Sequence, residues 1–399
     1  MDLLEIKSNY KFNDKFDKIK RRLSKNPLIS WYYQMMSEDM QFDDLPDVVI
    51  NAPCFKEDFW HRRSEDMKER GKRVALCGHY IQGKYYPLQG IKDVEKIYLC
   101  HDRFCDNCQN GMAVQRSEKY EPALMKLTED YDIYHVVLTV PNVGLFSLSL
   151  TIDRIFRAYK RLCIFLSGRK NVRGVNYSGF GYLGSIRALE VTKNKEMNTF
   201  HPHLHCIFIC RKGSKLALKR THQNTYSFKS TNSHISRGID IRLFNDYEIL
   251  LQKTWRLLYE GIELNYSNLD ELKVGYSCMI DNAKGRYKEV FKYATKGLLS
   301  SDPDKDPMDS YSDFVLLFIS LFRRRLIQGY GCLYNLKFDE KIDLSPDDIY
   351  LQIIEELNKL EKPMEFNSYF YEVEDEIVNG KNITYISRRS VARLGADDE

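Results

Sequence analysis

The feature that most constrains the fold is a pair of long apolar runs separated by a short polar turn. Residues 181–192 (GYLGSIRALEVT) and residues 199–210 (TFHPHLHCIFIC) are joined through residues 194–198 (NKEMN). Runs of this composition and length predict β-strands, and so short a connection makes the two strands antiparallel neighbours. The pair therefore predicts an antiparallel sheet within the chain.

Three histidines alternate along the second run, at His201, His203 and His205. Successive side chains of a strand point to opposite faces, so His203 and His205 share one face while Leu204 points into the core. Glu190 is the only acid in the apolar stretch of the first run, where an unpaired carboxylate is costly to bury. Two imidazoles and one carboxylate can bind a divalent cation and leave positions open for a substrate oxygen. The pattern favours a functional metal site over histidines that are satisfied within a core.

Four cysteines with the spacing C-x22-C-x4-C-x2-C come earlier in the chain: Cys77, Cys100, Cys105 and Cys108. A CxxC turn supplies two thiolates to one cation, and four such ligands match the tetrahedral coordination of structural zinc. The spacing predicts a closed zinc site, in which His79 or His101 could replace one cysteine. The flanking patterns of a redox CxxC motif and of a zinc deaminase are missing, which disfavours both.

A third polar cluster surrounds Tyr293. A helix over residues 285–298 places Glu289, Lys292, Tyr293 and Lys296 on one side and apolar residues on the other. A phenol ionises near pH ~10 in water, so a nucleophilic tyrosine needs positive charge nearby, which Lys292 and Lys296 could supply. A surface helix with paired charges is the common alternative.

The net charge of +4 conceals an uneven distribution. Residues 340–399 hold 15 acidic and 7 basic side chains, which leaves 53 basic and 41 acidic side chains, a net charge of +12, in residues 1–339. A basic body favours a polyanionic partner, and an acidic tail is typical of a solvated or interacting appendage. We expect contacts with the DNA backbone from the basic connection after the second strand: Arg211, Lys212, Lys215, Lys219 and Arg220.

Other apolar patterns predict the surrounding elements. A β-branched run that begins at His135 ends before Pro141, and a further strand is expected over residues 272–280. Apolar residues at helical spacing predict helices over residues 150–166, 247–259, 314–326 and 346–360. No run of 18 apolar residues occurs, and the N-terminus lacks the apolar core of a signal peptide. We therefore expect a cytoplasmic protein that makes no contact with a membrane.

Three of these patterns, in this order, resemble the HUH endonucleases, and specifically the rolling-circle plasmid replication initiators (Rep proteins) with one catalytic tyrosine. Residues 138–142 (LTVPN) resemble the first motif of that family. Residues 190–194 (EVTKN) and 199–205 (TFHPHLH) resemble the second, and residues 289–296 (EVFKYATK) resemble the third. A cysteine-rich segment precedes the first motif in the family as it does here. The resemblance covers roughly residues 73–335.

The resemblance implies an α+β fold in which helices flank a central antiparallel sheet, preceded by a small zinc module. His203 and His205 would hold Mg²⁺ or Mn²⁺ with Glu190 as the third ligand, and the cysteines would hold Zn²⁺. The implied organisation has five segments: an N-terminal helical region of unassigned role (1–70), the zinc module (71–117), the nicking domain (118–300), a helical extension (301–339) and an acidic tail with one helix (340–399).

The resemblance also implies a reaction on single-stranded or cruciform origin DNA. Tyr293 would attack one phosphodiester, which leaves a 5′-phosphotyrosyl link and a free 3′-OH primer. Glu289 would activate water at termination, and the accessory candidates are Thr139, Asn142 and His201. No Gly-x4-Gly-Lys-Ser/Thr pattern occurs, so unwinding is assigned to a host helicase, as synthesis is to a host DNA polymerase.

Three other functions remain open at this point. An HUH transposase uses the same chemistry on transposon ends, and only the DNA substrate separates it from a replication initiator. A histidine-triad nucleotide hydrolase also has alternating histidines but needs no metal, and it would leave the cysteines and the tyrosine helix unexplained. A non-catalytic zinc-dependent DNA-binding protein would use the histidines as a second structural metal site.

Overall fold

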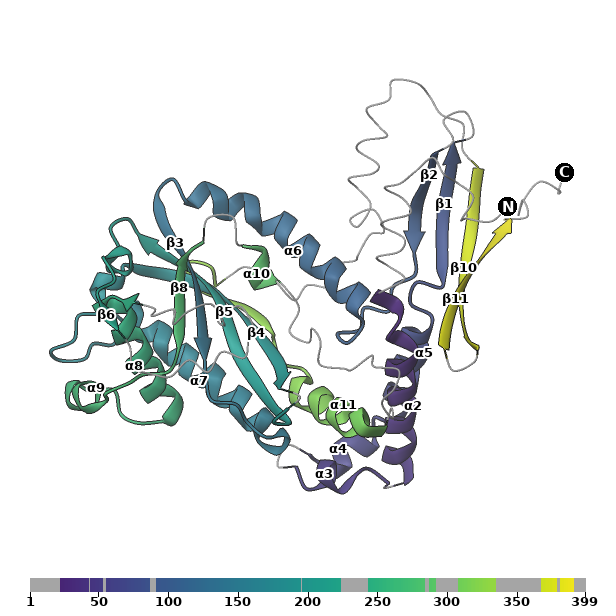
Figure 1. Ribbon diagram of the computed structural model, residues 1–399, viewed down its shortest axis with the longest axis horizontal. Coiled ribbons are helices and arrows are strands. Elements are labelled where there is room, and N and C mark those ends of the chain that lie inside the picture. The colour runs from purple at the N-terminus through teal and green to yellow at the C-terminus, as the bar shows by residue number, and fades with distance from the viewer. Residues whose placement is uncertain are drawn as a thin grey trace.

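The structure is a computed structural model that describes residues 22–42, 44–52, 55–86, 91–194, 196–223, 243–283, 287–291, 308–334, 367–378 and 381–390. Figure 1 shows a five-stranded sheet among several helices and a four-stranded sheet on the opposite side of the molecule. The fold is α+β, as the sequence predicts.

The five-stranded sheet has the order β8–β3–β5–β4–β9, and each neighbouring pair is antiparallel. The predicted strand pair is confirmed as β4 and β5, with Asn194 opposite Thr199 at the turn. The histidine run therefore lies on the central strand. The bounds of the five strands are β3 Tyr131–Thr139, β4 Tyr182–Asn194, β5 Thr199–Arg211, β8 Cys278–Asn282 and β9 Ile327–Gly331.

Helices α7 (Leu148–Leu166) and α8 (Asp246–Glu260) cover one face of this sheet. Their apolar sides bury Tyr159 and Trp255 in the same core as Leu204 of β5. Both helices follow the apolar periodicity of the sequence, and both predictions are confirmed.

Helices α6 (Asp106–Leu127) and α10 (Lys288–Phe291) lie over the other face. Phe291 is buried there in a second, smaller core with Ala188 and Ile207. α6 is continuous across the boundary expected between residues 117 and 118, so the cysteine segment leads directly into this face of the sheet.

The N-terminal helices pack against α11 (Met308–Leu321). The rings of Tyr32 and Tyr33 lie 5.1 and 5.0 Å from that of Phe314. α11 ends earlier than the helix expected over residues 314–326, because Arg323 adopts a left-handed conformation (φ 54°) and the chain turns into β9. The N-terminal helices are α2 Asn26–Phe42, α3 Asp47–Ile50, α4 Glu57–His61 and α5 Ser64–Ala75.

The four-stranded sheet pairs the segment that follows α5 with the C-terminal segment, in the order β11–β10–β1–β2. β10 pairs antiparallel with β1, with Glu372 opposite Tyr80. The acidic C-terminal segment thus contributes two strands, which its composition does not predict; the helix expected over residues 346–360 lies outside the described residues. The strands are β1 Tyr80–Tyr86, β2 Ile91–Ile97, β10 Asn367–Val378 and β11 Lys381–Ser390.

Shorter elements complete the described part of the chain. The strand expected over residues 272–280 is β8, which begins only at Cys278. None of the helices described is both long enough and apolar enough to cross a membrane. The short elements are η2 Leu145–Ser147, η3 Ser178–Phe180, η4 Lys215–Ala217, β6 His222–Gln223, β7 Leu243–Phe244 and α9 Tyr266–Glu271.

Candidate functional site

Glu190, His203 and His205 converge on one face of the central sheet. Glu190 of β4 is directly opposite His203 of β5 in the strand register. The Nε2 atoms of His203 and His205 lie 3.6 and 2.9 Å from Oε2 of Glu190. One ligand atom from each of the three residues lies within 4.8 Å of the others. The structure therefore brings together the three residues that the sequence predicts as metal ligands.

Both imidazoles are held by their other ring nitrogen. Nδ1 of His203 lies 3.0 Å from the backbone oxygen of His201, and Nδ1 of His205 lies 3.2 Å from Nε2 of His135. A neutral imidazole that donates its Nδ1 proton has its lone pair on Nε2. Metal-binding histidines are typically oriented in this way. The donor set of two Nε2 atoms and a carboxylate thus fits a divalent cation with further positions left open.

The electrostatics favour an ionised carboxylate in this site. Burial by itself raises the pKa of Glu190, but in the metal-free site, where Nε2 can carry a proton, the interactions with His203 and His205 outweigh burial and hold that pKa well below its usual range. Burial, reinforced by the charge of His203, lowers the pKa of His201 to about 4. His201 is therefore neutral at neutral pH, and its backbone oxygen rather than its ring orients His203.

His135 is a site residue that the sequence analysis missed. It is buried on β3, and its ring stacks on that of His205 with the centroids 5.4 Å apart. Val137 is opposite His205, so His135 lies one diagonal step away on the same face, and Asp281 of β8 lies directly opposite His135. The pairing of β3 with β5 is the signal that could have identified it.

The accessory candidates of the first motif hold the end of β3 in place. The Thr139 hydroxyl donates to the backbone oxygen of Ser277 at 2.8 Å, and Trp255 Nε1 donates to the backbone oxygen of Thr139 at 2.7 Å. The Asn142 side-chain nitrogen lies 3.3 Å from Oγ1 of Thr199. The first two bonds fix the end of β3 against Ser277 and α8, and the third fixes the following loop against β5.

α10 lies on the same face as the three ligands. Ala188 shares a face with Glu190, and Ile207 shares one with His205, because strand residues two apart point the same way. Both Ala188 and Ile207 are buried with α10 in the smaller core.

Of the predicted third motif, Glu289 lies within α10, whereas Lys292, Tyr293 and Lys296 lie outside the described residues. Tyr287, the nearest described tyrosine, is buried in the smaller core. Burial and the nearby charge of Glu121 raise the pKa of Tyr287, which makes it a poor nucleophile.

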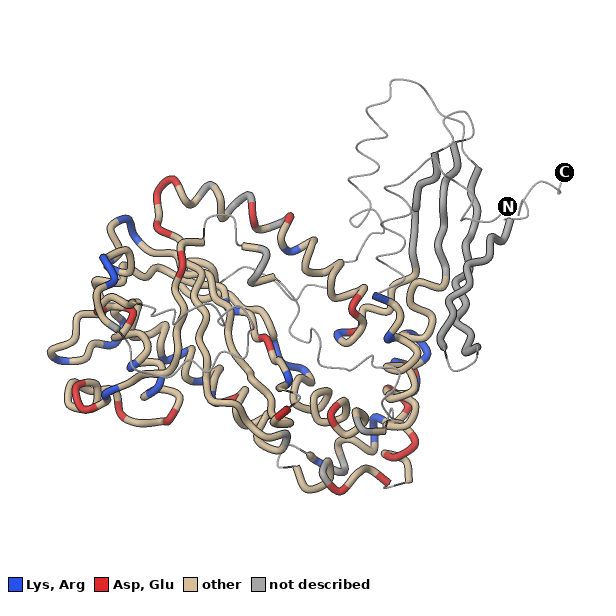
Figure 2. The backbone as a smooth tube through the Cα atoms, in the orientation of Figure 1, with Lys and Arg blue, Asp and Glu red and all other residues tan. Residues whose placement is uncertain are grey.

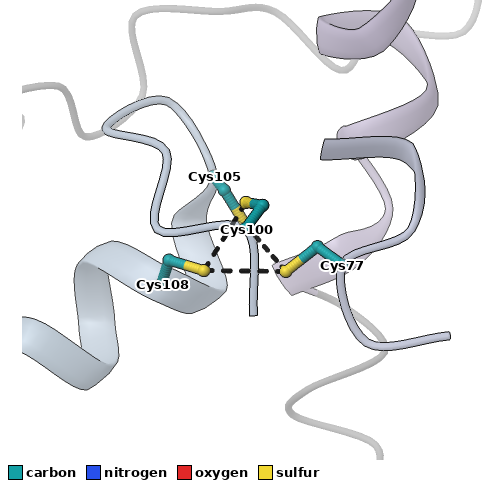
Figure 3. Close-up of side chains that lie close together, drawn as sticks. All are labelled: Cys77, Cys100, Cys105 and Cys108. Carbon is teal, nitrogen blue, oxygen red and sulfur yellow. Dashed lines mark hydrogen bonds between the residues drawn. The ribbon is translucent and has the colours of Figure 1, made fainter. Parts of the chain in front are cut away.

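The four cysteines form a second cluster, in which the side chains point toward one another (Figure 3). Cys77 Sγ lies 3.6 Å from the sulfurs of Cys105 and Cys108, and Cys100 Sγ lies 3.6 Å from that of Cys108. Four thiolates at ~2.3 Å from one zinc ion would be about 3.8 Å apart, whereas a disulfide requires about 2.05 Å. Hydrogen bonds from Cys100, Cys108 and Cys77 hold the pKa of Cys105 well below its usual value. The cluster fits a tetrahedral zinc site without His79 or His101.

The cysteine loop is anchored to the N-terminal helices through Asp102. Its carboxylate accepts hydrogen bonds from the Tyr33 hydroxyl at 2.9 Å and from Arg70 at 3.1 Å. Its other oxygen accepts from the backbone nitrogen of Phe104 at 2.9 Å. The N-terminal region therefore supports the cysteine cluster directly.

The predicted DNA-contacting connection lies beyond the far end of β5. Six residues separate His205 from Arg211, about 20 Å along a strand. Lys212 donates to the backbone oxygen of Thr128 at 2.9 Å, and Arg220 forms an ion pair at 2.7 Å with Glu248, which is fully buried. Arg211, Lys215 and Lys219 are exposed, and the structure does not bring this group to the metal ligands.

Comparison with known proteins finds replication proteins. A family model described as "Replication protein" matches residues 92–216, a range that includes three of the four cysteines and all of β3, β4 and β5. No solved structure matches the chain significantly.

Two relatives are both called "Protein rep". One, from Streptococcus pneumoniae serotype 2, is 23% identical over 280 residues, which cover 66% of this chain and 69% of the relative. The other, from a Bacillus species, is 25% identical over 297 residues, which cover 73% of this chain and 88% of the relative. Together with the fold and the histidine site, these comparisons show that the chain is similar to Rep-type replication proteins.

Proposed function

We propose that the protein is a rolling-circle replication initiator that nicks single-stranded origin DNA through a tyrosine nucleophile. The observation that carries the proposal is the geometry around Glu190: the two Nε2 atoms of His203 and His205 face its carboxylate, and a separate hydrogen bond to each Nδ1 atom fixes the rings. The position of α10 on the same face supports the third motif as the source of the nucleophile.

The three ligands would hold Mg²⁺ or Mn²⁺, which, when bound, polarises the scissile phosphate. Tyr293 then attacks the phosphorus, so that a phosphotyrosyl bond forms and the bond to the 3′ oxygen breaks. The 3′ oxygen takes up a proton and becomes the primer for a host polymerase. Lys292 and Lys296 stabilise the ionised phenol through their positive charge.

Glu289 completes the cycle in this proposal. It lies one helical turn from Tyr293 in sequence, where its carboxylate can accept a proton from the attacking water. Hydrolysis then frees the tyrosine and leaves a 5′-phosphate, whereas attack by a 3′-OH rejoins the strand. Unwinding of the duplex is left to a host helicase, and a structural Zn²⁺ at the four cysteines secures the segment that leads into α6.

The test is incubation of the protein with Mn²⁺ and single-stranded DNA that carries the origin, followed by denaturing electrophoresis. Wild-type protein should form a covalent adduct, and Tyr293→Phe should form none. Tyr287→Phe is the matched control, because it removes the buried hydroxyl of the same segment and should keep the adduct. An adduct with Tyr293→Phe would reject this nucleophile.

The outcome also separates the alternatives. Cleavage of transposon ends but not of origin DNA would indicate a transposase, which uses the same residues. Binding of origin DNA without any adduct would indicate a non-catalytic DNA-binding protein. Metal-independent cleavage of a small nucleotide would indicate a histidine-triad hydrolase.

A further inference from the structure

A block of positive charge lies away from the site described above. From residue 154 to residue 189 the sequence has eight basic residues and no Asp or Glu. This block supplies two thirds of the +12 net charge of residues 1–339. Arg187 is one of the eight, but it is buried in the core and is not available to a partner.

Six of these residues define the α7 basic stripe: Arg154, Arg157, Lys160 and Arg161 on α7, and Arg169 and Lys170 directly after it. All six side chains are exposed. Residues 154, 157 and 161 follow the i, i+3, i+7 spacing and therefore share one side of the helix. The other side of α7 is buried against the sheet. Figure 2 marks the basic residues of this region in blue along the backbone.

No carboxylate neutralises the stripe within the described part of the chain. Arg157 donates from Nε to the backbone oxygen of Asp153 at 3.4 Å, whereas the carboxylate of Asp153 pairs with Arg324 at 2.8 Å. Lys170 lies 5.6 Å from the ring centre of Phe165, which is a cation–π contact and leaves its charge in place.

A helix that merely faces solvent usually mixes charges of both signs. α5 is such a helix, because Lys68 and Lys72 pair with Glu65 and Glu69 at 3.9 and 2.7 Å. A helix face with cations alone lacks this stabilisation, since like charges one turn apart repel one another. The absence of acids over 36 residues therefore points to an anionic partner.

The dimensions of the stripe match a DNA backbone. The helical part of the stripe runs from Arg154 to the end of α7 at Leu166, about 18 Å at the rise of an α-helix. One strand of duplex DNA carries a phosphate every ~3.4 Å along the helix axis, so a stripe of this length faces about five phosphates. We propose that the α7 basic stripe binds the phosphate backbone of duplex DNA, independently of its sequence.

The location of the stripe suits this role. α7 covers the face of the sheet opposite the one that carries Glu190, His203 and His205. Duplex DNA on α7 would leave the histidine face open to a single strand. The identity of this duplex as the DNA beside the origin rests on the proposed function, whereas binding of a duplex does not.

The test measures binding of a labelled 30-base-pair duplex of random sequence between 50 and 200 mM KCl. The variant Arg154→Gln/Arg157→Gln/Arg161→Gln should lose three phosphate contacts. The negative slope of log K against log salt should then become shallower by about 2.7, and binding should weaken roughly 10²-fold at 0.1 M salt. The matched control Lys68→Gln/Lys72→Gln/Arg73→Gln removes the same charge from an exposed helix and should change binding several-fold at most.

If the stripe variant and the control variant lost the same affinity for the duplex, only net charge would matter and the proposal would be wrong. Unchanged affinity in the stripe variant would also overturn it. Tighter binding of a double-stranded RNA of equal length would assign the stripe to RNA instead. If the triple variant does not fold, the double variant Arg169→Gln/Lys170→Gln in the exposed turn replaces it. The negative salt slope of that variant should become shallower by about two.

The adduct assay on single-stranded origin DNA distinguishes this proposal from the proposed function. The stripe variant should keep adduct formation, since the stripe lies on the other face of the sheet. If wild-type protein bound the duplex but formed no adduct, the nicking function would be rejected, whereas the proposal that the stripe binds duplex DNA would stand.

Discussion

Nε2 of His135 lies 3.2 Å from Nδ1 of His205, and the two rings stack almost in parallel, at 8°. His205 is the ligand whose Nε2 approaches Glu190 most closely, at 2.9 Å. For Nε2 to bind a cation, the proton of this imidazole must be on Nδ1, and His135 is then the acceptor of that proton. His135 thus selects the tautomer of His205 without contacting the cation itself.

Replacing His135 should therefore weaken metal binding at the histidine site. His135→Phe keeps a ring of similar size but has no acceptor, and we expect Mn²⁺ affinity to fall about 10–100-fold. His135→Gln provides an acceptor oxygen and should recover part of that loss. Titration of Mn²⁺ followed by electron paramagnetic resonance measures both. Equal Mn²⁺ affinity in the Phe and Gln variants would show that His135 contributes only through packing and not as a hydrogen-bond acceptor.

Glu190→Gln should change how the stability of the metal-free protein depends on pH. In the metal-free protein, interactions with the two histidines outweigh burial and depress the pKa of Glu190, so its contribution is present above the unfolded value of ~4.3 and is lost as the pH falls below it. We expect the variant to be about 1.5–3 kcal/mol less stable at pH 7, with the difference shrinking between pH 5 and pH 3.

Thermal denaturation in EDTA across this pH range measures the effect. Glu196→Gln removes an exposed carboxylate from the turn between β4 and β5 and should follow wild type at every pH. A constant difference between wild type and Glu190→Gln would contradict the depressed pKa.

Cys105→Ser should abolish zinc binding at the cysteine cluster. It removes the thiol that its neighbours hold in the ionised form, and zinc sites of this kind contribute directly to folding. We expect the zinc content, measured by mass spectrometry of the purified protein, to fall from one ion per chain toward none, with a lower Tm. Cys332→Ser changes an exposed thiol outside the cluster and should retain the zinc.

Truncation after residue 339 should destabilise the cysteine segment rather than only remove charge. It deletes β10 and β11, and so leaves the backbone groups of β1 that pair with β10 without partners. Limited trypsin digestion should then cut faster between Cys77 and Cys100. A chain that ends at residue 390 keeps both strands and should resist cleavage as the full chain does.

Local patterns were enough to predict the centre of the fold. The apolar runs of β4 and β5 and the helical periodicity of α7 and α8 each carry their own signal, and strand alternation alone places His203 and His205 on one face. The cysteine cluster follows from its spacing for the same reason.

The parts of the fold and of the site that were not predicted depend on contacts between segments far apart in sequence. His135 belongs to the site only because β3 pairs with β5, and nothing near residue 135 indicates this. β9 has the sequence IQGYG, and its two glycines are unfavourable in strands, so the sequence pattern does not predict a strand there. The C-terminal strands were missed because their acidic composition resembles that of a solvated tail.

The pairing of β1 with β10 has a consequence for the protein as the ribosome makes it. Tyr86, at the end of β1, precedes Asn367, at the start of β10, by 281 positions. At roughly 5–20 residues per second, translation needs about 15–60 s to supply the strand that completes this sheet. The nascent chain therefore carries an open strand edge next to its cysteine cluster until translation has passed β10.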